Sequence, residues 1–115
     1  MKLVVAVIQP TKLQAVREGL ANVEVERMTI CDAFGYGRQR GRAALYRGVE
    51  YGAPLLRKAV LEIVVNDDFL ERTIDTILAC AVTGPEGQFG DGKIFVMPVD
   101  GVCRIHDGLH GKEAV

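Results

Sequence analysis

A run of glycines around one aspartate and one lysine is the part of the sequence best suited to bind an anion. Residues 83–98 read TGPEGQFGDGKIFVMP and contain Gly84, Gly87, Gly90, Gly92, Asp91 and Lys93. Glycines let successive backbone amides turn toward one anion, and the lysine adds positive charge. The segment predicts an anion-binding loop, with a purely structural alternative: a helix C-cap at Gly84 and a tight turn at Asp91–Gly92.

Part of this run also matches a phosphate-loop pattern. Residues 87–93, GQFGDGK, satisfy the first seven positions of G-x-x-x-x-G-K, but Ile94 stands where Ser or Thr must bind magnesium. The flanking elements are reversed as well, because a helical pattern precedes the glycines and a strand pattern follows them. We therefore reject the Walker interpretation.

A second candidate is the basic and aromatic segment at 36–51, YGRQRGRAALYRGVEY. It combines Arg38, Arg40, Arg42 and Arg47 with Tyr36, Tyr46 and Tyr51, and its first acidic residue is Glu50. Such a mixture suits RNA, phosphorylated ligands or an acidic protein surface. Long irregular segments in small domains tend to be functional, so we interpret this one as a docking arm.

Three residues near the C-terminus have a spacing that metal sites use. Cys103, His106 and His110 form a C-x₂-H-x₃-H pattern. A closed zinc site usually needs four ligands, and only three are local here, so we favour an interpretation without a metal.

Composition limits the broad class. The chain has 115 residues, with 14 basic and 15 acidic side chains and a net charge of −1, so it has no overall attraction to nucleic acid. The longest apolar runs, at 3–8 and 59–65, are too short to cross a bilayer, and we expect a cytoplasmic protein without membrane insertion. The three dispersed cysteines fit reduced thiols.

The order of elements predicts the fold. We expect strands at 2–9, 25–34, 60–65 and 93–99, with a short strand or extension at 102–105. Helices are expected at 12–22, begun by a capping box of Thr11 and Gln14, and at 66–81, with a long loop at 35–54 between the halves. This order is the split βαβ (βαββαβ) pattern of a ferredoxin-like α+β fold, in one domain spanning 1–115.

The strands also predict self-association. Three of the four are apolar at nearly every position, which indicates that both faces of the sheet are buried. Two helices can cover only one face, so we predict an obligate homo-oligomer.

Five segments together resemble one known family. They are GYGRQRG (35–41), YRGVEY (46–51), Lys58 before VLEIVVNDD, TG (83–84) and GDGKIFV (90–96). In this order they resemble the PII signal-transduction proteins of bacteria, archaea and plastids. The resemblance implies a non-enzymatic homotrimer of ferredoxin-like subunits with ATP or ADP in the clefts between neighbours. It also implies that magnesium-ATP supports 2-oxoglutarate binding.

The resemblance further assigns names and roles to segments. It implies a T-loop at about 36–54 that changes shape to bind an ammonium transporter, a metabolic enzyme or a regulator. It implies a B-loop at about 83–92 and a C-terminal segment at about 102–115. Tyr51 on the T-loop resembles a tyrosine that some members have uridylylated.

Residue roles are carried over position by position. The resemblance implies that Gln39 binds magnesium, that Arg104 reaches in from the adjoining subunit, and that Val64 and Ile8 flank the adenine beside Val7. The small-anion site would use Gln39, Arg40, Lys58 and Gly90. The implied nucleotide-binding set is Val7, Gly35, Gly37, Arg38, Gln39, Val64, Gly90, Asp91, Gly92, Lys93, Arg104 and His106.

Four departures from the family pattern leave alternatives open. PEGQF at 85–89 makes the B-loop three residues longer, and His106 replaces a usual arginine. Gln9 stands where the family often has Lys or Arg, and Val49 replaces a serine that some members have phosphorylated. The alternative is thus a paralogue in carbon metabolism that senses ATP, ADP or AMP with another small anion such as bicarbonate.

Two other classes are weaker. A slow ATPase or small transferase would need a general base, and none is evident. An RNA-binding ferredoxin-like module would need several exposed aromatic residues on a sheet strand. The strand KIFVMPV (93–99) has Phe95 as its single aromatic residue.

Overall fold

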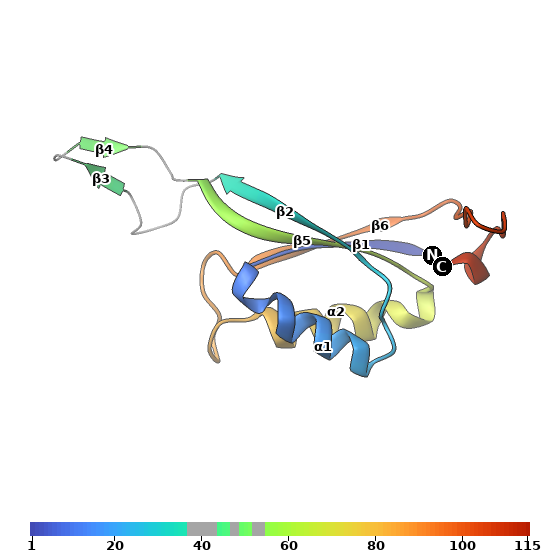
Figure 1. The fold of residues 1–115 in the computed structure, drawn as a ribbon. Coiled ribbons are helices and arrows are strands. Elements are labelled where there is room, and N and C mark those ends of the chain that lie inside the picture. Colours follow the sequence, from blue (N-terminus) through green and yellow to red (C-terminus); the bar gives the residue numbers. More distant parts are fainter. Residues whose placement is uncertain (37–43, 47–48, 52–54) are drawn as a thin grey trace.

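The protein forms a two-layer α+β structure in which two helices lie on one face of a four-stranded sheet (Figure 1). The computed structural model describes residues 1–36, 44–46, 49–51 and 55–115. The four-stranded sheet and its helices consist of β1 (Lys2–Ile8), α1 (Leu13–Asn22), β2 (Thr29–Tyr36), β5 (Leu55–Val65), α2 (Asp67–Ala81) and β6 (Gly92–Pro98). There are also two short 3₁₀ helices among the described residues. The first, η1 (Pro10–Lys12), precedes α1, and the second, η2 (Lys112–Ala114), is the last element.

The sheet is antiparallel throughout, in the order β2-β5-β1-β6. The central strand β1 pairs with β5 from Lys2↔Val65 to Ile8↔Ala59, and with β6 from Lys2↔Pro98 to Ile8↔Gly92. This order confirms the predicted ferredoxin-like split βαβ fold, with one strand–helix–strand unit in each half of the chain.

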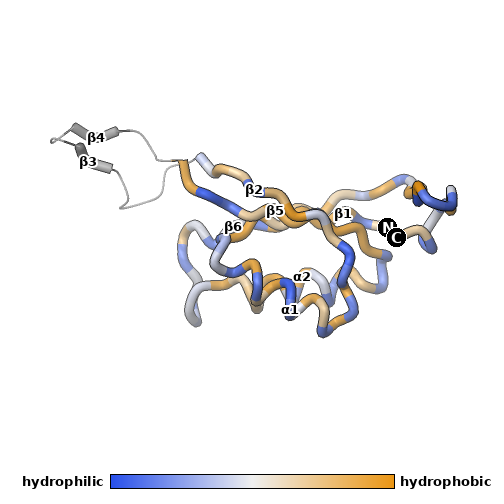
Figure 2. Tube along the Cα trace, viewed as in Figure 1, coloured by the Kyte–Doolittle hydropathy of each residue, from blue (hydrophilic) through white to orange (hydrophobic). Residues whose placement is uncertain are grey.

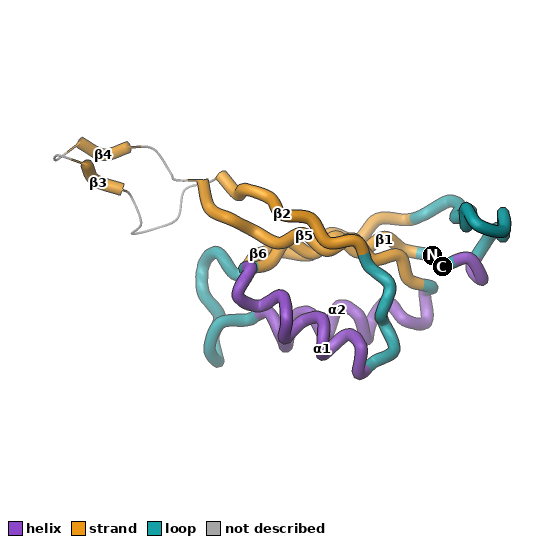
Figure 3. The backbone as a smooth tube through the Cα atoms, viewed as in Figure 1, coloured by secondary structure: helices purple, strands orange, loops and turns teal. Residues whose placement is uncertain are grey.

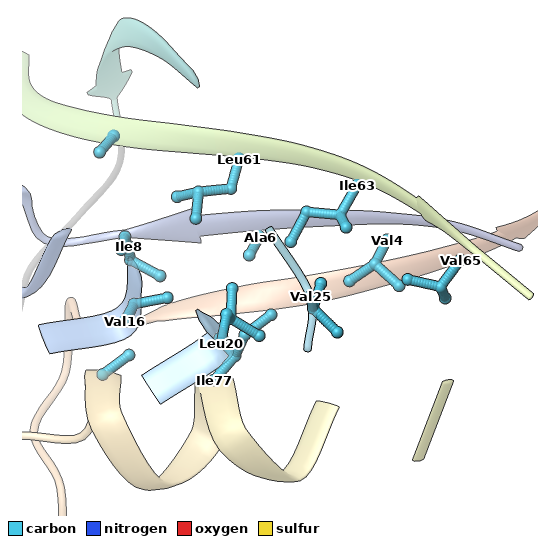
Figure 4. Close-up of a cluster of buried hydrophobic side chains, with 12 residues drawn as sticks. Val4, Ala6, Ile8, Val16, Leu20, Val25, Leu61, Ile63, Val65 and Ile77 are labelled. Carbon is cyan, nitrogen blue, oxygen red and sulfur yellow. The ribbon is translucent and has the colours of Figure 1, made fainter. Parts of the chain in front are cut away.

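The core lies between the sheet and the helices (Figure 4). Val4, Ala6 and Ile8 alternate inward along β1, and Leu61 and Ile63 do the same along β5. The helices contribute Val16, Leu20 and Ile77, which lie on the apolar side of each helix that faces the sheet. Figure 3 shows both helices on the same side of the sheet.

The opposite face of the sheet is mostly apolar, and the two helices do not cover it (Figure 3). Residues paired across antiparallel strands point to the same face, so the register places seven apolar residues there. They are Leu3, Val5, Val7, Val60, Val64, Phe95 and Met97, and we call them the outer face. Phe95 is 49% exposed and Met97 is 42% exposed. Figure 2 shows how apolar residues recur along these strands.

The first helix begins differently from the prediction. A capping box of Thr11 and Gln14 was expected, but Pro10–Lys12 form η1 and α1 then begins at Leu13 without a side-chain cap. Gln14 instead donates from Nε2 to Glu18 Oε1 at 2.8 Å, one helical turn further along. The capping-box prediction is therefore wrong, because Thr11, the predicted cap, lies inside the 3₁₀ turn that Pro10 begins.

Several strand boundaries also move. Residues 25–28 precede the second strand, and β2 instead continues through Gly35 and Tyr36, which were assigned to the loop. The next strand begins at Leu55, five residues before its predicted start. The predicted loop at 35–54 therefore begins two residues later than expected and ends at residue 54 as expected. It also contains two short paired strands, β3 (Ala44–Tyr46) and β4 (Val49–Tyr51).

The glycine-rich segment and the C-terminal segment are turns. Val82 ends α2 in an extended conformation, so the predicted C-cap at Gly84 is wrong, although Gly84 has a positive φ of 68°. The tight turn lies at Gln88–Asp91 and not at Asp91–Gly92, because Asp91 N donates to Gln88 O at 3.2 Å and Gly92 already belongs to β6. Residues 102–105 form only one isolated bridge, Cys103↔His110.

Within the described residues, no helix is both long and apolar enough to cross a membrane.

Candidate functional site

A cleft of about 590 Å³ lies where the end of the sheet meets the loop between α2 and β6. Its walls come from β1, β2, β5, β6 and the 82–91 loop. Seven of the residues assigned from the sequence line it: Val7, Gly35, Lys58, Gly90, Asp91, Gly92 and Lys93. The described part of the chain thus brings the predicted small-anion lysine and the predicted anion-binding loop into one space.

Lys58 joins the sheet to the loop. It lies on β5 opposite Ala33 of β2, and its Nζ donates a hydrogen bond to the Gly90 carbonyl oxygen at 2.7 Å. The bond is partly buried and joins residues 32 positions apart. Because an ammonium has three donors, this bond leaves other donors of Lys58 available to a bound group.

Asp91 organises the loop through its carboxylate. Oδ1 accepts from Thr83 Oγ1 at 2.6 Å and from Gln9 Nε2 at 3.4 Å. Oδ2 accepts from the backbone amides of Thr83 at 3.0 Å and Gln88 at 2.9 Å. One side chain therefore ties the beginning, the turn and the end of the loop together, and also ties the loop to Gln9 after β1.

These donors favour the ionised form of Asp91. The Thr83 hydroxyl, followed by the amides of Thr83 and Gln88, lowers the pKa of Asp91 from 3.8 to about 2. A carboxylate that accepts several hydrogen bonds is harder to protonate, because protonation weakens every one of them. The carboxylate is consequently charged at neutral pH and directed at the loop.

Glycine is required where the loop enters β6. Gly92 has a φ of 109°, and a Cβ atom there would lie 1.7 Å from the Val7 carbonyl oxygen. Gly90, with a φ of 93°, also occupies a conformation that side-chain-bearing residues rarely adopt. The bare backbone noted in the sequence thus permits both a left-handed path and a close approach to β1.

Two other predicted residues lie away from this cleft in the same chain. Arg104 belongs to the C-terminal segment, at the end of the sheet opposite the 82–91 loop (Figure 1). Its Nε and Nη2 donate to Asp107 Oδ1 and Oδ2 at 3.1 and 2.6 Å, and this ion pair raises the pKa of Arg104 and lowers that of Asp107. His106 is exposed beside it, with Nε2 3.5 Å from Asp107 Oδ2.

The three apolar positions assigned to the adenine are also separated. Val7 pairs with Val60, whereas Val64 pairs with Leu3, four residues further along each strand. At about 3.3 Å per residue this is about 13 Å along the sheet. Ile8 lies on the other face, buried at 2% exposure in the core. One chain therefore does not bring Val7 and Val64 together.

Some predicted residues lie outside the described residues. Gly37, Arg38, Gln39 and Arg40 belong to this group, so the magnesium assignment of Gln39 stays a prediction. Tyr51 ends β4 and pairs with Ala44 through the backbone, and its modification is likewise a prediction.

The structure adds cleft residues that the sequence reasoning missed. Tyr36, Leu56, Gln88, Phe89 and Phe95 line the same space. Phe95 could have been found from the alternation of β6, which places it on the outer face between Lys93 and Met97. Phe89 belongs to the PEGQF segment and is 82% exposed, and no local pattern indicated its position.

The three residues of the C-x₂-H-x₃-H spacing do not meet. Cys103 Sγ lies 3.8 Å from His110 Nε2, whereas His106 contacts Asp107. Nowhere in the described ranges do three or more His, Cys, Asp or Glu side chains gather in a way that could hold a metal ion.

Comparison with known proteins finds similarity along nearly the whole chain. Residues 1–108 match the family model described as nitrogen regulatory protein P-II. The chain is 47% identical to nitrogen regulatory protein GlnK1 of Methanosarcina mazei, an alignment that covers 100% of this chain and 97% of the relative. It is 45% identical to nitrogen regulatory protein P-II of Bradyrhizobium diazoefficiens and 46% identical to nitrogen regulatory protein P-II 1 of Escherichia coli K12, both over the full length of each chain.

Proposed function

Because the chain belongs to the nitrogen regulatory P-II family, we propose that it binds ATP or ADP in clefts between three subunits and controls partner proteins through residues 36–54. Membership of the family gives the protein's general role, which is signal-transduction regulation of nitrogen metabolism.

The observation that carries the proposal is the cleft at the end of the sheet. Lys58, Lys93 and the backbone of Gly90 and Gly92 line it together. Ammonium groups and unhindered amides are the donor set that a polyphosphate requires. Asp91 has a positioning role in this proposal, because its carboxylate is occupied by Thr83, Gln88 and Gln9 and would repel a phosphate placed against it.

The separation of the other assigned residues supports a site shared between subunits. Val7 and Val64 are too far apart in one chain to flank one base. Lys93 lies at the start of β6, whereas Arg104 follows the other end of that strand. A second copy would supply Val64, Arg104 and His106 to the Lys93 end of its neighbour. In this arrangement Gln39 would hold the magnesium ion that accompanies ATP.

The uncovered outer face supports the trimer. Its seven apolar residues lie on three neighbouring strands, with Glu62 and Lys93 on the same face, and the other face of the sheet is already packed against the helices. Apolar residues that recur on the uncovered side of three neighbouring strands favour a second protein surface that covers them. Self-association of identical subunits is the simplest way to do so.

The strands connect the cleft to the arm. Gly35 and Tyr36 of β2, and Leu56 and Lys58 of β5, line the cleft next to the residues where the 36–54 segment leaves and rejoins the sheet. A ligand can shift the arm only if it binds two arm conformations with different affinity. Contacts at the base of the arm are where such a difference would arise. The arm would then bind an ammonium transporter, a metabolic enzyme or a regulator, and Tyr51 would be its residue for modification.

The second ligand is either 2-oxoglutarate or another small anion such as bicarbonate. Lys58 would bind a carboxylate in either case, together with Gln39 and Arg40. Gln9 favours the second candidate, because it is neutral and already donates to Asp91, where many members have a cation. Replacing a cation by a neutral residue removes more Coulomb attraction from a dianion than from a monoanion.

Calorimetry tests this proposal. ATP and ADP are titrated into the intact protein with magnesium, alone and then with 2-oxoglutarate or bicarbonate, and sedimentation measures the assembly. Lys93→Ala should weaken ATP binding by about tenfold or more, since a hydrogen bond to a charged group contributes about 1.5–3 kcal/mol.

Arg17→Ala is the matched control, because it also removes one positive charge but from the exposed surface of α1. ATP binding that is unaffected by Lys93→Ala, or a stable monomer that binds no adenine nucleotide, would refute the proposal. Heat of binding enhanced by bicarbonate and unchanged by 2-oxoglutarate would select the second candidate.

A further inference from the structure

The C-terminal segment holds a cysteine and a histidine side by side on a small, well-braced hairpin. Cys103 Sγ lies 3.8 Å from His110 Nε2, and both residues are exposed. Neither residue has a place in the proposed nucleotide site. Thiolate sulfur and imidazole nitrogen are the two ligands that Zn²⁺ and related borderline ions prefer in proteins.

The backbone explains why the two side chains meet. Arg104 N donates to Leu109 O at 2.8 Å, and Gly111 N donates to Val102 O at 3.0 Å, on either side of the Cys103↔His110 bridge. This pattern makes Cys103 and His110 a non-hydrogen-bonded antiparallel pair, in which facing side chains approach more closely than in the hydrogen-bonded kind.

The hairpin is held in shape independently of any ion. Gly108 N donates to Arg104 O at 2.8 Å, and Asp107 accepts from the Leu109 amide at 3.1 Å while it also pairs with Arg104. A preformed pair of ligands binds an ion with less loss of conformational entropy than two ligands on a mobile chain.

The spacing also fits the ion. With Zn–S of about 2.3 Å and Zn–N of about 2.0–2.1 Å, two ligand atoms of a tetrahedral zinc ion lie about 3.6 Å apart. The observed 3.8 Å between Sγ and Nε2 needs only a small adjustment to reach that value. The remaining positions would be left to water, because no third such side chain within the described residues joins the pair.

We propose that Cys103 and His110 form an open two-ligand site for a borderline transition-metal ion of the Zn²⁺ type. The cysteine binds as the thiolate and the histidine through Nε2, so binding releases the thiol proton to solvent. His106 is excluded from the site, although its sequence spacing suggested it, because it lies in the 105–107 turn against Asp107.

The test uses the intact protein without a purification tag. Zn²⁺ is titrated against a chromophoric chelator, and Co²⁺ is titrated separately to detect the thiolate-to-cobalt charge-transfer absorption in the near ultraviolet. One ion per chain should bind. Cys103→Ser should remove the charge-transfer band and weaken Zn²⁺ binding by about tenfold or more, and His110→Gln should weaken it similarly.

His106→Gln is the matched control and should leave both readouts unchanged. A Cys31→Ser variant, which removes the other exposed cysteine, should also retain the band. Binding that survives Cys103→Ser, or that is lost in His106→Gln or Cys31→Ser, would overturn the proposal. The titration contains no nucleotide, so its outcome is distinguishable from failure of the proposed nucleotide site.

Discussion

Asp91 shows how one charged side chain can shape a site without facing the ligand. Its two oxygens accept from Thr83 and Gln88 of the same loop and from Gln9, which follows β1. Lys58 then holds the Gly90 carbonyl next to it. The position of the cleft's glycines therefore depends on an ionised carboxylate beneath them.

This dependence predicts how the loop responds to acid. The folded pKa of Asp91 is about 2, below its ordinary value of 3.8, so its contribution to stability is present above about pH 3.8 and is lost as the pH falls through about 2. In an NMR titration, the amides of Thr83 and Gln88 should change shift with a midpoint near 2. The Asp91→Asn variant, which lacks the titrating group, should remove this transition. A midpoint near 3.8 would contradict the described hydrogen bonds.

Gly92 should tolerate no side chain. In Gly92→Ala the new Cβ would lie 1.7 Å from the Val7 carbonyl oxygen at a φ of 109°, so β6 must move away from β1. We expect the free energy of unfolding to fall by at least about 2 kcal/mol. Urea denaturation at a fixed protein concentration measures this loss.

Gly84→Ala is the matched control for that measurement. Gly84 also has a positive φ, but a Cβ there meets nothing within 4 Å. Its cost should be limited to the left-handed conformation, about 1–2 kcal/mol. Equal losses in the two variants would show that the contact with Val7 is unimportant.

At the scale of elements, the two helices approach closely where α1 carries a glycine. A Cβ on Gly19 would lie 2.7 Å from Cys80 Sγ and 3.0 Å from Thr76 Cγ2 on α2. Gly19→Ala gains helix propensity of about 1 kcal/mol but must displace the cysteine. We therefore expect Gly19→Ala to be more favourable in a Cys80→Ala background than in the wild type, by about 1 kcal/mol.

A double-mutant cycle in urea measures that coupling between Gly19 and Cys80. The exposed Cys31 on β2 provides the comparison, since Cys31→Ala removes a thiol far from this contact. Additive effects of Gly19→Ala and Cys80→Ala would mean that the helices adjust without cost.

The elements also show which parts of the fold are local in sequence. Both helices and the strand at 2–9 were predictable, because their apolar residues recur at regular spacing along the chain. The beginning of β5 was missed because Arg57 and Lys58 interrupt the apolar run. Pairing with Ala33–Tyr36 of β2 is what makes these residues a strand, and such pairing leaves no local signal.

The candidate site divides in the same way. The family resemblance assigned Lys58, Gly90 and Lys93 to neighbouring roles, and they line one cleft. The bonds from Thr83 and Gln9 to Asp91 were not predicted, because they depend on the turn at Gln88–Asp91 and on contact with the end of β1. Contacts between loops and distant strands require the assembled fold.

At the scale of the whole molecule, the outer face predicts the assembly. Phe95→Asp places a charge at the middle of that face beside Val5, where it would be desolvated in any covering interface. We expect the variant to sediment as a smaller species with its helical circular dichroism retained, because Phe95 is outside the helix-side core.

Leu78→Asp is the matched control for this prediction. Leu78 is 57% exposed on α2, on the opposite side of the sheet. Its replacement should leave sedimentation unchanged. Dissociation caused by Leu78→Asp and not by Phe95→Asp would place the interface on the helices instead.

The hydrogen bond from Lys58 to the Gly90 carbonyl offers a direct way to detect a ligand in the cleft. An anion bound in the cleft would accept from the same ammonium group of Lys58. The hydrogen bond to the Gly90 carbonyl would therefore be kept, weakened or lost, depending on the anion. A single ¹³C label at Gly90 would turn that competition into a vibrational signal. Different guests could then be distinguished in solution without attaching a dye to the chain.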